Sequence, residues 1–133
     1  RNTPKFHYNL FKKYGDKKCY LCECNTDKII VGAHIHRVTD IKKDSSIDDD
    51  EKGRQVIDGD NGLWLCSNHD KLFEWGVIYF DNDTLTINLE EVTESQKRFI
   101  EELTTNSQIE TKHFNKNMNN YLLKHRSRFR KSF

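Results

Sequence analysis

The sequence predicts a single α+β domain whose small core is held together by a bound metal ion. Short β-branched segments alternate with amphipathic helical stretches, and neither type dominates. Charged residues make up 32% and apolar residues 35% of the 133 positions, which leaves little material for a core. Two cysteine-containing pairs occur at the spacing of metal ligands. Small, polar domains usually need such a staple.

The N-terminal half contains one predicted helix and one predicted strand, separated by a cysteine-rich knuckle at residues 19–24. Residues 4–15 predict an amphipathic helix that ends at a glycine, and residues 28–35 predict a strand. Charged and turn-forming residues fill positions 39–59, which we expect to form a long loop or insertion. The apolar face expected of the first helix consists of Phe6, Leu10, Phe11 and Tyr14.

The C-terminal half predicts a buried strand at residues 62–65, followed by a short helix that Ser67 or Asn68 could cap and Gly76 ends. A hairpin is expected at residues 77–89, and Thr93 begins a capping box that opens another helix. The last helical stretch extends towards residue 130. Its regularly spaced side chains favour a role in the core over one as ligands: Met118, Tyr121, Leu122, His125 and Phe129.

Cys19, Cys22, Cys66 and His69 form the predicted metal site. The first two residues form a Cys-x-x-Cys pair and the last two a Cys-x-x-His pair, and each pair can contact an ion from a tight turn. Together the two pairs make one tetrahedral Cys₃His set with no open position, which is typical of structural zinc. Cys24 could replace Cys22, although a Cys-x-Cys bite is less favourable. The alternative is that the four cysteines are unrelated buried residues. A disulfide framework is disfavoured because three cysteines cluster together, so reduced thiols and a cytoplasmic location are expected.

Charge is distributed unevenly along the chain. Residues 1–22 carry six Lys/Arg and one acid, and residues 111–133 carry seven Lys/Arg and no acid, whereas residues 40–60 carry eight acids and four Lys/Arg. Basic ends around an acidic middle favour a polyanionic partner, although a basic tail can also serve solubility alone. No apolar run approaches the ~18 residues of a membrane span, so no membrane partner is expected.

The ordered motifs CxxC, AHI and NGLxLCxxHxKLFxxG resemble those of HNH endonucleases, which carry the ββα-metal motif. The resemblance is greatest to the AHI and NGL branch that is common in bacterial restriction endonucleases. It covers roughly residues 4–90 and extends to YLLKHRSRF near the C-terminus. It implies one domain over residues 1–133, with a zinc-stapled ββα-metal core at about 19–76, flanking helices at both ends and the extra hairpin.

The resemblance also implies roles for individual residues. His34 matches the general base, Asn61 the residue that orients it, and Asp70 the ligand of a catalytic divalent ion. A carboxylate ligand favours Mg²⁺ or Mn²⁺. His36 lies two positions beyond His34 and could contact the phosphate or the ion, or be a bystander. Many relatives place Asp where this chain has Ala33, which leaves Asp70 as the one clear protein ligand of the ion.

DNA contacts are expected from basic side chains near this site and in the C-terminal segment. Glu74 could bind an ion-bound water, although bracing of the helix end is the more common role. The acidic stretch 44–51 would repel DNA and is expected to point away from it or to contact another domain. The basic residues assigned to DNA binding are Arg37, Lys71, Arg126, Arg128 and Arg130.

These features predict a metal-dependent endonuclease acting on double-stranded DNA, as the cleavage domain of a bacterial restriction enzyme. Double-strand cleavage would require two sites and hence a homodimer, and the initial Arg is consistent with a piece of a longer chain that carries a DNA-recognition domain. Two alternatives are a zinc-stapled DNA-binding module without turnover and a zinc domain for protein contacts. The pairing of His34 with Asp70 favours the enzyme, since a binding module needs no general base.

Overall fold

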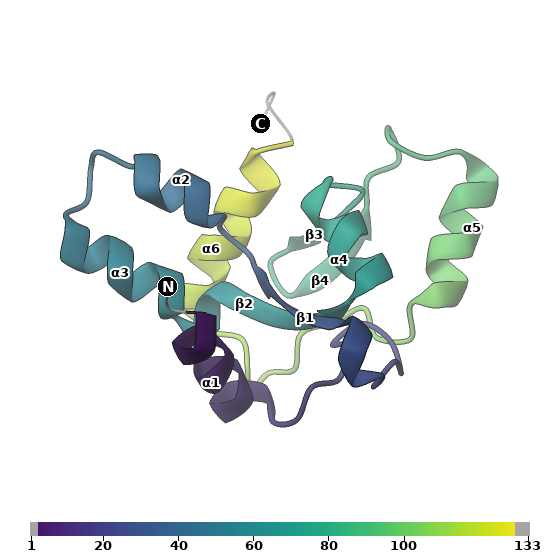
Figure 1. The fold of residues 1–133 in the computed structure, drawn as a ribbon. Helices are drawn as coiled ribbons and strands as arrows, with labels where there is room; N and C mark the ends of the chain where they lie inside the picture. Colours follow the sequence, from purple (N-terminus) through teal and green to yellow (C-terminus); the bar gives the residue numbers. More distant parts are fainter. Residues whose placement is uncertain (1–2, 130–133) are drawn as a thin grey trace.

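A two-stranded antiparallel sheet and the helix after it form the centre of the molecule (Figure 1). The computed structural model describes residues 3–129. Strand β1 (Ile30–His34) pairs with β2 (Gly62–Cys66), and α4 (Ser67–Glu74) begins directly after β2. The register places Ile30 opposite Cys66 at one end of the sheet and His34 opposite Gly62 at the other. Cys66, a predicted zinc ligand, and His34, the predicted general base, therefore lie at opposite ends of one short sheet.

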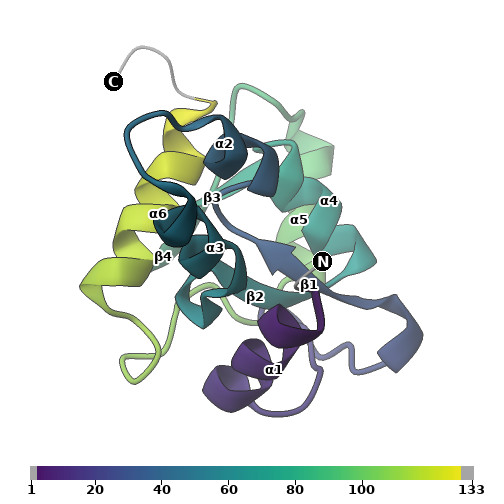
Figure 2. The same cartoon turned by 60° about the vertical axis from the view of Figure 1, so that its left-hand side comes forward.

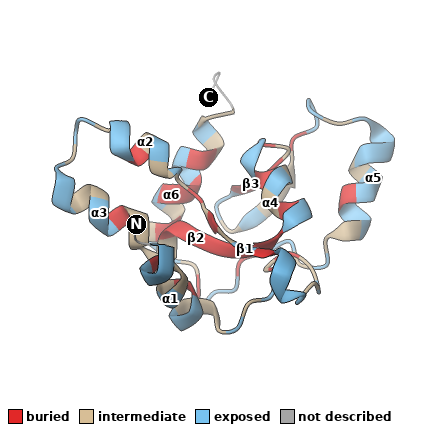
Figure 3. Ribbon diagram, in the orientation of Figure 1, coloured by how far each residue is buried: buried red, intermediate tan, exposed pale blue. Residues whose placement is uncertain are grey.

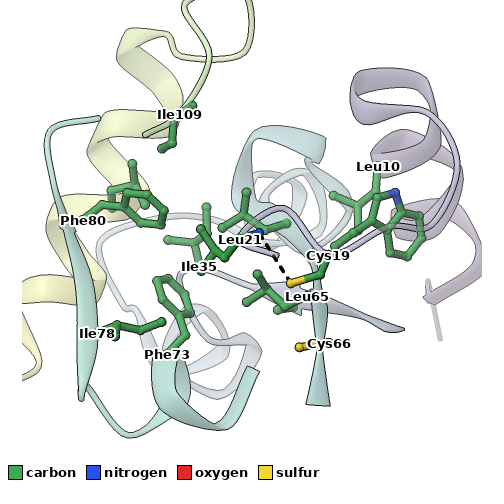
Figure 4. Close-up of a cluster of buried hydrophobic side chains, with 14 of the residues drawn as sticks. Leu10, Cys19, Leu21, Ile35, Leu65, Cys66, Phe73, Ile78, Phe80 and Ile109 are labelled. Carbon is green, nitrogen blue, oxygen red and sulfur yellow. Dashed lines mark hydrogen bonds between the residues drawn. The ribbon is translucent and has the colours of Figure 1, made fainter. Parts of the chain in front are cut away.

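Strand β2 is buried along its whole length, as Figure 3 shows by its continuous red colour. Such a run of buried apolar residues is expected of a strand covered on both faces. Figure 4 shows the core beside it, where Leu21, Ile35 and Leu65 meet Phe73 and Phe80. The apolar core is therefore continuous from the cysteine knuckle to the end of α4.

Helix α1 (Thr3–Tyr14) covers the sheet from below in Figure 1. Phe6 and Leu10 are buried as predicted, but Phe11 is 52% exposed and lies outside the core. Gly15 ends the helix with φ +87°, a conformation that favours glycine. The predicted helix and its end are confirmed, and its apolar face is narrower than expected.

The expectation of a long loop over residues 39–59 is wrong, because this segment forms α2 (Val38–Lys43) and α3 (Asp49–Ile57). Asp48 caps α3 by accepting a hydrogen bond from the Glu51 backbone N–H, and three acidic residues occupy the first turn of α3. Acidic side chains stabilise a helix N-terminus through the helix dipole. The acidic run is thus an N-terminal helix signal. Figure 2 shows α2 and α3 against α6.

Beyond α4, a second sheet pairs β3 (Ile78–Asp81) with β4 (Thr84–Ile87), and α5 (Glu94–Leu103) follows. The capping box of Thr93 and Gln96 is present, which confirms the predicted start of α5. Helix α4 also begins where expected, but its N-cap is Cys66, not Ser67 or Asn68. The Ser67 hydroxyl instead donates to the Ile29 carbonyl, 3.3 Å away. Gly76, with φ +73°, follows the end of α4.

Helix α6 (Lys116–Ser127) packs on β3 and returns the chain to the centre of the molecule. Of its predicted core side chains, Met118, Tyr121, Leu122 and His125 are buried, whereas Phe129 lies just after the helix and is only partly buried. Six α-helices and two two-stranded sheets among residues 3–129 agree with the α+β class. No helix in this part of the chain has the length and apolar character needed to cross a membrane.

Candidate functional site

Four predicted ligands meet where the cysteine knuckle touches the start of α4. The ligand atoms of Cys19, Cys22, Cys66 and His69 all lie within 4.8 Å of one another. Cys19, Cys66 and His69 are buried, and none of the cysteines forms a disulfide. Cys24 is outside this cluster, and its carbonyl oxygen accepts a hydrogen bond from the Cys19 N–H. The sequence prediction of which residues group together is confirmed.

The spacing of these four atoms fits a tetrahedral zinc ion. Zn–S bonds of about 2.3 Å and Zn–N bonds of about 2.0–2.1 Å imply S···S and S···N edges of roughly 3.8 and 3.6 Å. The Cys22 and Cys66 sulfurs are 3.8 Å apart, and His69 Nδ1 lies 3.6 Å from the Cys19 sulfur and 3.3 Å from that of Cys66. The donor set and its dimensions therefore suit zinc.

Burial and hydrogen bonds also act on the ligand groups of the cluster. Burial is the main reason why the pKa of Cys19 is raised to about 12; the neighbouring thiols of Cys66 and Cys22 act in the same direction, and backbone hydrogen bonds oppose the shift. A bound metal ion would offset this by stabilising thiolates. His69 Nε2 donates to the Thr104 hydroxyl at 2.9 Å, and that hydroxyl donates to the Ile100 carbonyl at 2.8 Å. This leaves Nδ1 of His69 as the ligand atom.

A separate cavity of about 240 Å³ lies between β1, α4 and the end of α6. His34 from β1 and Asp70 from α4 both line it. The strand and the helix are held together by the β1–β2 pairing and by the direct passage of β2 into α4. The other lining residues are Val31, Gly32, Ala33, Arg37, Phe73, Glu74, His125 and Arg128.

His34 is fixed in one orientation and one tautomer. Its ring stacks on Phe6, with ring centroids 3.8 Å apart and planes 10° apart. Nε2 lies 2.8 Å from the Val56 carbonyl oxygen, which can only accept, so Nε2 carries the proton and Nδ1 has a free lone pair. Burial lowers the pKa of His34 below 6.5, although the hydrogen bond to Val56 opposes this. The imidazole is thus neutral at pH 7.

Asn61 is fully buried and holds the chain that follows β1. Its side-chain oxygen accepts from the His36 N–H at 2.7 Å, and its amide donates to the carbonyls of His36 and Gln55 at 3.1 and 3.2 Å. Its own carbonyl accepts from the Ile35 N–H. Asn61 thereby joins the end of β1 to the last turn of α3, which also supplies the Val56 carbonyl.

Asp70 and Glu74 are one helical turn apart on α4, and both line the cavity. Burial raises the pKa of Asp70, and the nearby Glu74 carboxylate raises it further. Two carboxylates that share a cavity favour a cation between or beside them. Among the described residues, only the zinc-type cluster brings three or more His, Cys, Asp or Glu ligand atoms within 4.8 Å, so an ion at Asp70 would take its remaining ligands from water and substrate.

Of the remaining predicted site residues, some line the cavity and others lie outside it. Arg37 and Arg128 line the cavity, whereas His36 and Lys71 are not among its lining residues. Burial and the nearby Arg37 lower the pKa of Arg128, as expected where two cations approach the same space. Lys71 Nζ forms an exposed ion pair with Glu74 Oε1, 3.6 Å away.

Arg126 is occupied by the hairpin, since it donates to the Phe80 carbonyl at 3.2 Å and contacts the Asp81 carboxylate at 3.3 Å. Arg130 lies outside the described residues.

A comparison with protein-family models decides which known proteins this arrangement resembles. Residues 19–81 match the HNH endonuclease family. The HNH match covers just under half of the chain, from the first predicted zinc ligand through β3. It includes both Cys/His pairs and all of β1, β2 and α4. At the level of the family, an HNH endonuclease is a metal-dependent nuclease that hydrolyses DNA. No curated protein matches the chain.

Four groups near the two sites were missed or misjudged from the sequence. Phe6 was assigned only to the core, the Val56 carbonyl lies in the expected loop, and Thr104 follows α5 with no motif. His125 was assigned to the core and is indeed buried, yet it also lines the cavity. Of these four, only His125 could have been suspected from the sequence. Histidine is less often fully buried than the Leu and Met residues on the same helix face, so its presence there indicates a possible second role.

Proposed function

We propose that this chain is a metal-dependent DNA endonuclease that hydrolyses phosphodiester bonds in the cavity between β1 and α4. The observation that supports it best is that His34 and Asp70, which come from different elements, line the same cavity. One is a neutral base with a free nitrogen, and the other is a hard carboxylate ligand. A base and an electrophile site converging on one space are what phosphodiester hydrolysis requires.

In this proposal His34 is the general base. Its Nδ1 lone pair accepts a proton from the attacking water, and the hydrogen bond from Nε2 to the Val56 carbonyl stabilises the imidazolium that forms. Stacking on Phe6 prevents rotation of the ring. Asn61 acts indirectly, because it fixes the backbone that follows the base and the turn of α3 that carries Val56. General bases of this kind typically contribute 10²–10⁴-fold to the rate.

Asp70 is the proposed ligand of a Mg²⁺ or Mn²⁺ ion, which when bound would stabilise negative charge on the phosphate. Arg37 and Arg128, which line the same cavity, are proposed to orient the phosphate group. Glu74 adds a second negative charge one turn after Asp70. Arg126 and Lys71 would then contribute to DNA binding only from outside the cavity.

The zinc-type cluster has a structural role in this proposal. Cys66 ends β2 and His69 lies in the first turn of α4, so a zinc ion would tie the start of the helix to the knuckle at residues 19–22. His69 and Asp70 are adjacent, and the first faces the cluster while the second lines the cavity. Zinc would thus fix the helix that presents Asp70.

We further propose that the chain is the cleavage domain of a bacterial restriction enzyme, which acts on double-stranded DNA as a homodimer in the cytoplasm together with a separate recognition domain. The basic residues around the cavity would supply affinity for the phosphate backbone but would not distinguish one base sequence from another. Sequence selection would therefore need another domain. The acidic segment 44–51, which leads into α3 and forms its first turn, is a candidate surface for contact with that domain.

A plasmid-nicking assay tests the proposed activity. Wild type, His34→Ala and Asp70→Asn are compared with Mg²⁺, with Mn²⁺ and with neither, with zinc content measured in parallel. We expect conversion of supercoiled plasmid by wild type only in the presence of the divalent ion, and loss in both variants at unchanged zinc content. Glu91→Gln, which changes an exposed acid that lines neither site, is the matched control and retains activity.

Salt-sensitive DNA binding without cleavage by wild type under any metal condition would overturn the proposal. It would favour the alternative of a zinc-stapled binding module.

A further inference from the structure

His125 is a buried histidine that closes the cavity from the side of α6. Only 1% of its surface is exposed, and its ring stacks on Phe73 with centroids 3.7 Å and planes 5° apart. Nε2 lies 2.7 Å from the Phe73 carbonyl oxygen. Since a carbonyl only accepts, Nε2 carries the proton, and Nδ1 is left with a lone pair.

The Nδ1 atom of His125 is buried and has no hydrogen-bond partner among residues 3–129. Buried polar atoms are nearly always paired, and an unpaired one costs about 1–3 kcal/mol. His125 lines the cavity of about 240 Å³ that also contains His34 and Asp70. Because a water molecule takes about 30 Å³ of liquid volume, this cavity has room for several waters.

The end of α6 is attached to the end of α4 by more than this one ring. Arg128 donates to the Glu74 carbonyl at 2.9 Å, just as His125 donates to that of Phe73. A Cβ atom at Gly76 would approach the Phe129 ring to 2.4 Å, so the chain after α4 is closely packed against α6. His125 is therefore held rigidly relative to the helix that carries Asp70.

An ion bound by Asp70 would carry several waters, because one carboxylate leaves most of its coordination sites to water. Such waters are strong hydrogen-bond donors and need acceptors nearby. The unprotonated nitrogen of a neutral imidazole can accept such a hydrogen bond.

We propose that His125 is a positioning residue of the nuclease site, whose Nδ1 accepts a hydrogen bond from a water ligand of the ion at Asp70. This inference depends on the proposed function, since it requires the ion. It adds to the site a residue from outside the segment that matches the HNH family. It also explains why a histidine occupies a position in α6 that an apolar residue could fill.

The test is the affinity for Mn²⁺ of the zinc-loaded protein without DNA, measured by electron paramagnetic resonance. His125→Phe keeps a ring that can stack on Phe73 but removes the Nδ1 acceptor, together with the Nε2–H donor. We expect it to weaken Mn²⁺ binding by roughly 10–100-fold. His113→Phe is the matched control, because His113 is a buried histidine that contacts Tyr20 outside the cavity. Asp70→Asn serves as the reference for loss of the ion.

Mn²⁺ binding by His125→Phe equal to that of wild type, with weaker binding by Asp70→Asn, would overturn this inference and leave the proposed function intact. Equal binding by all three proteins would instead reject the ion site itself. If His125→Phe melts at a lower temperature, ¹⁵N-histidine spectra of wild type provide the answer. The Nδ1 resonance of His125 is expected to move as Mg²⁺ is added, and a constant resonance overturns the inference.

Discussion

His34 Nε2 donates a hydrogen bond of 2.8 Å to the carbonyl oxygen of Val56, a residue 22 positions later in the chain. This contact selects the tautomer in which Nδ1 can accept a proton. It also means that the last turn of α3, and not only the sheet, determines whether the base is competent.

Replacement of His34 by Ala should reduce DNA cleavage by 10²–10⁴-fold, the usual contribution of a general base. The folded state should survive, because the zinc-type cluster lies at the other end of the sheet. Steady-state nicking rates and zinc content measure the two effects. His113→Ala provides a histidine deletion away from the cavity. Activity within threefold of wild type in His34→Ala would exclude this residue as the base.

The rate of cleavage should depend on pH through His34. Burial lowers its pKa below 6.5, and only the neutral form can take a proton. The rate should therefore be constant near neutral pH and fall as the pH decreases through a value below 6.5. The pH profile of kcat/KM at saturating Mg²⁺ measures this midpoint. A midpoint above 6.5 would contradict the described environment of the ring.

Thr104 should affect zinc affinity although it is not a ligand. Its hydroxyl accepts from His69 Nε2 at 2.9 Å and so fixes the ring of a zinc ligand. Thr104→Val removes this hydrogen bond with little change in volume and should weaken zinc binding by roughly 10–100-fold. Competition with a chromogenic chelator measures the affinity. Thr104→Ser keeps the hydroxyl and should bind zinc as wild type does; equal weakening in both variants would indicate a packing effect.

Removal of zinc should unfold the domain. Structural zinc sites supply on the order of 10 kcal/mol to folding, which is comparable to the whole stability of a typical domain of about 5–15 kcal/mol. Cys66→Ser should give the same result, whereas Cys24→Ser should retain one zinc per chain because Cys24 lies outside the cluster. Circular dichroism and metal analysis are the measurements. A folded, metal-free Cys66→Ser variant would show that the core alone suffices.

Acid should destabilise the protein partly through His125. Burial lowers its pKa to about 4, whereas an unfolded chain has a histidine pKa near 6.5. Because the unfolded state binds the proton more tightly, stability is retained above pH 6.5 and lost as the pH falls towards 4, by up to about 3 kcal/mol. Urea unfolding at several pH values measures this loss.

The His125→Gln variant lacks this titrating group and should show a correspondingly smaller dependence on pH. The acid sensitivity of zinc binding is common to both proteins and cancels in the comparison. An identical pH dependence of the two proteins would mean that the ring is not held neutral by burial.

The zinc-type cluster and the ends of most elements could be predicted from the sequence because each depends on local chemistry. The Cys-x-x-Cys/His spacing, Gly15 and the capping box at Thr93 need no knowledge of distant contacts. The helices between residues 38 and 57 were missed because their charged residues resemble those of a loop. Acids at the first turn of α3 were the available signal.

The contacts of His34 and His125 could not be predicted, since both depend on carbonyls far away in the sequence. Val56 and Phe73 offer only their backbone oxygens, which every residue has. A pattern of side chains therefore cannot identify them. The same holds for Phe6, whose stacking on His34 follows from the tertiary position of α1.

The late position of α6 in the chain has a consequence for biosynthesis. A ribosome delivers the knuckle, both strands of the central sheet and α4 well before it delivers His125 and Arg128. A nascent chain at that stage would hold the base and the carboxylate but lack one wall of the cavity. If this wall is needed for cleavage, the nascent chain cannot cleave DNA until α6 has docked.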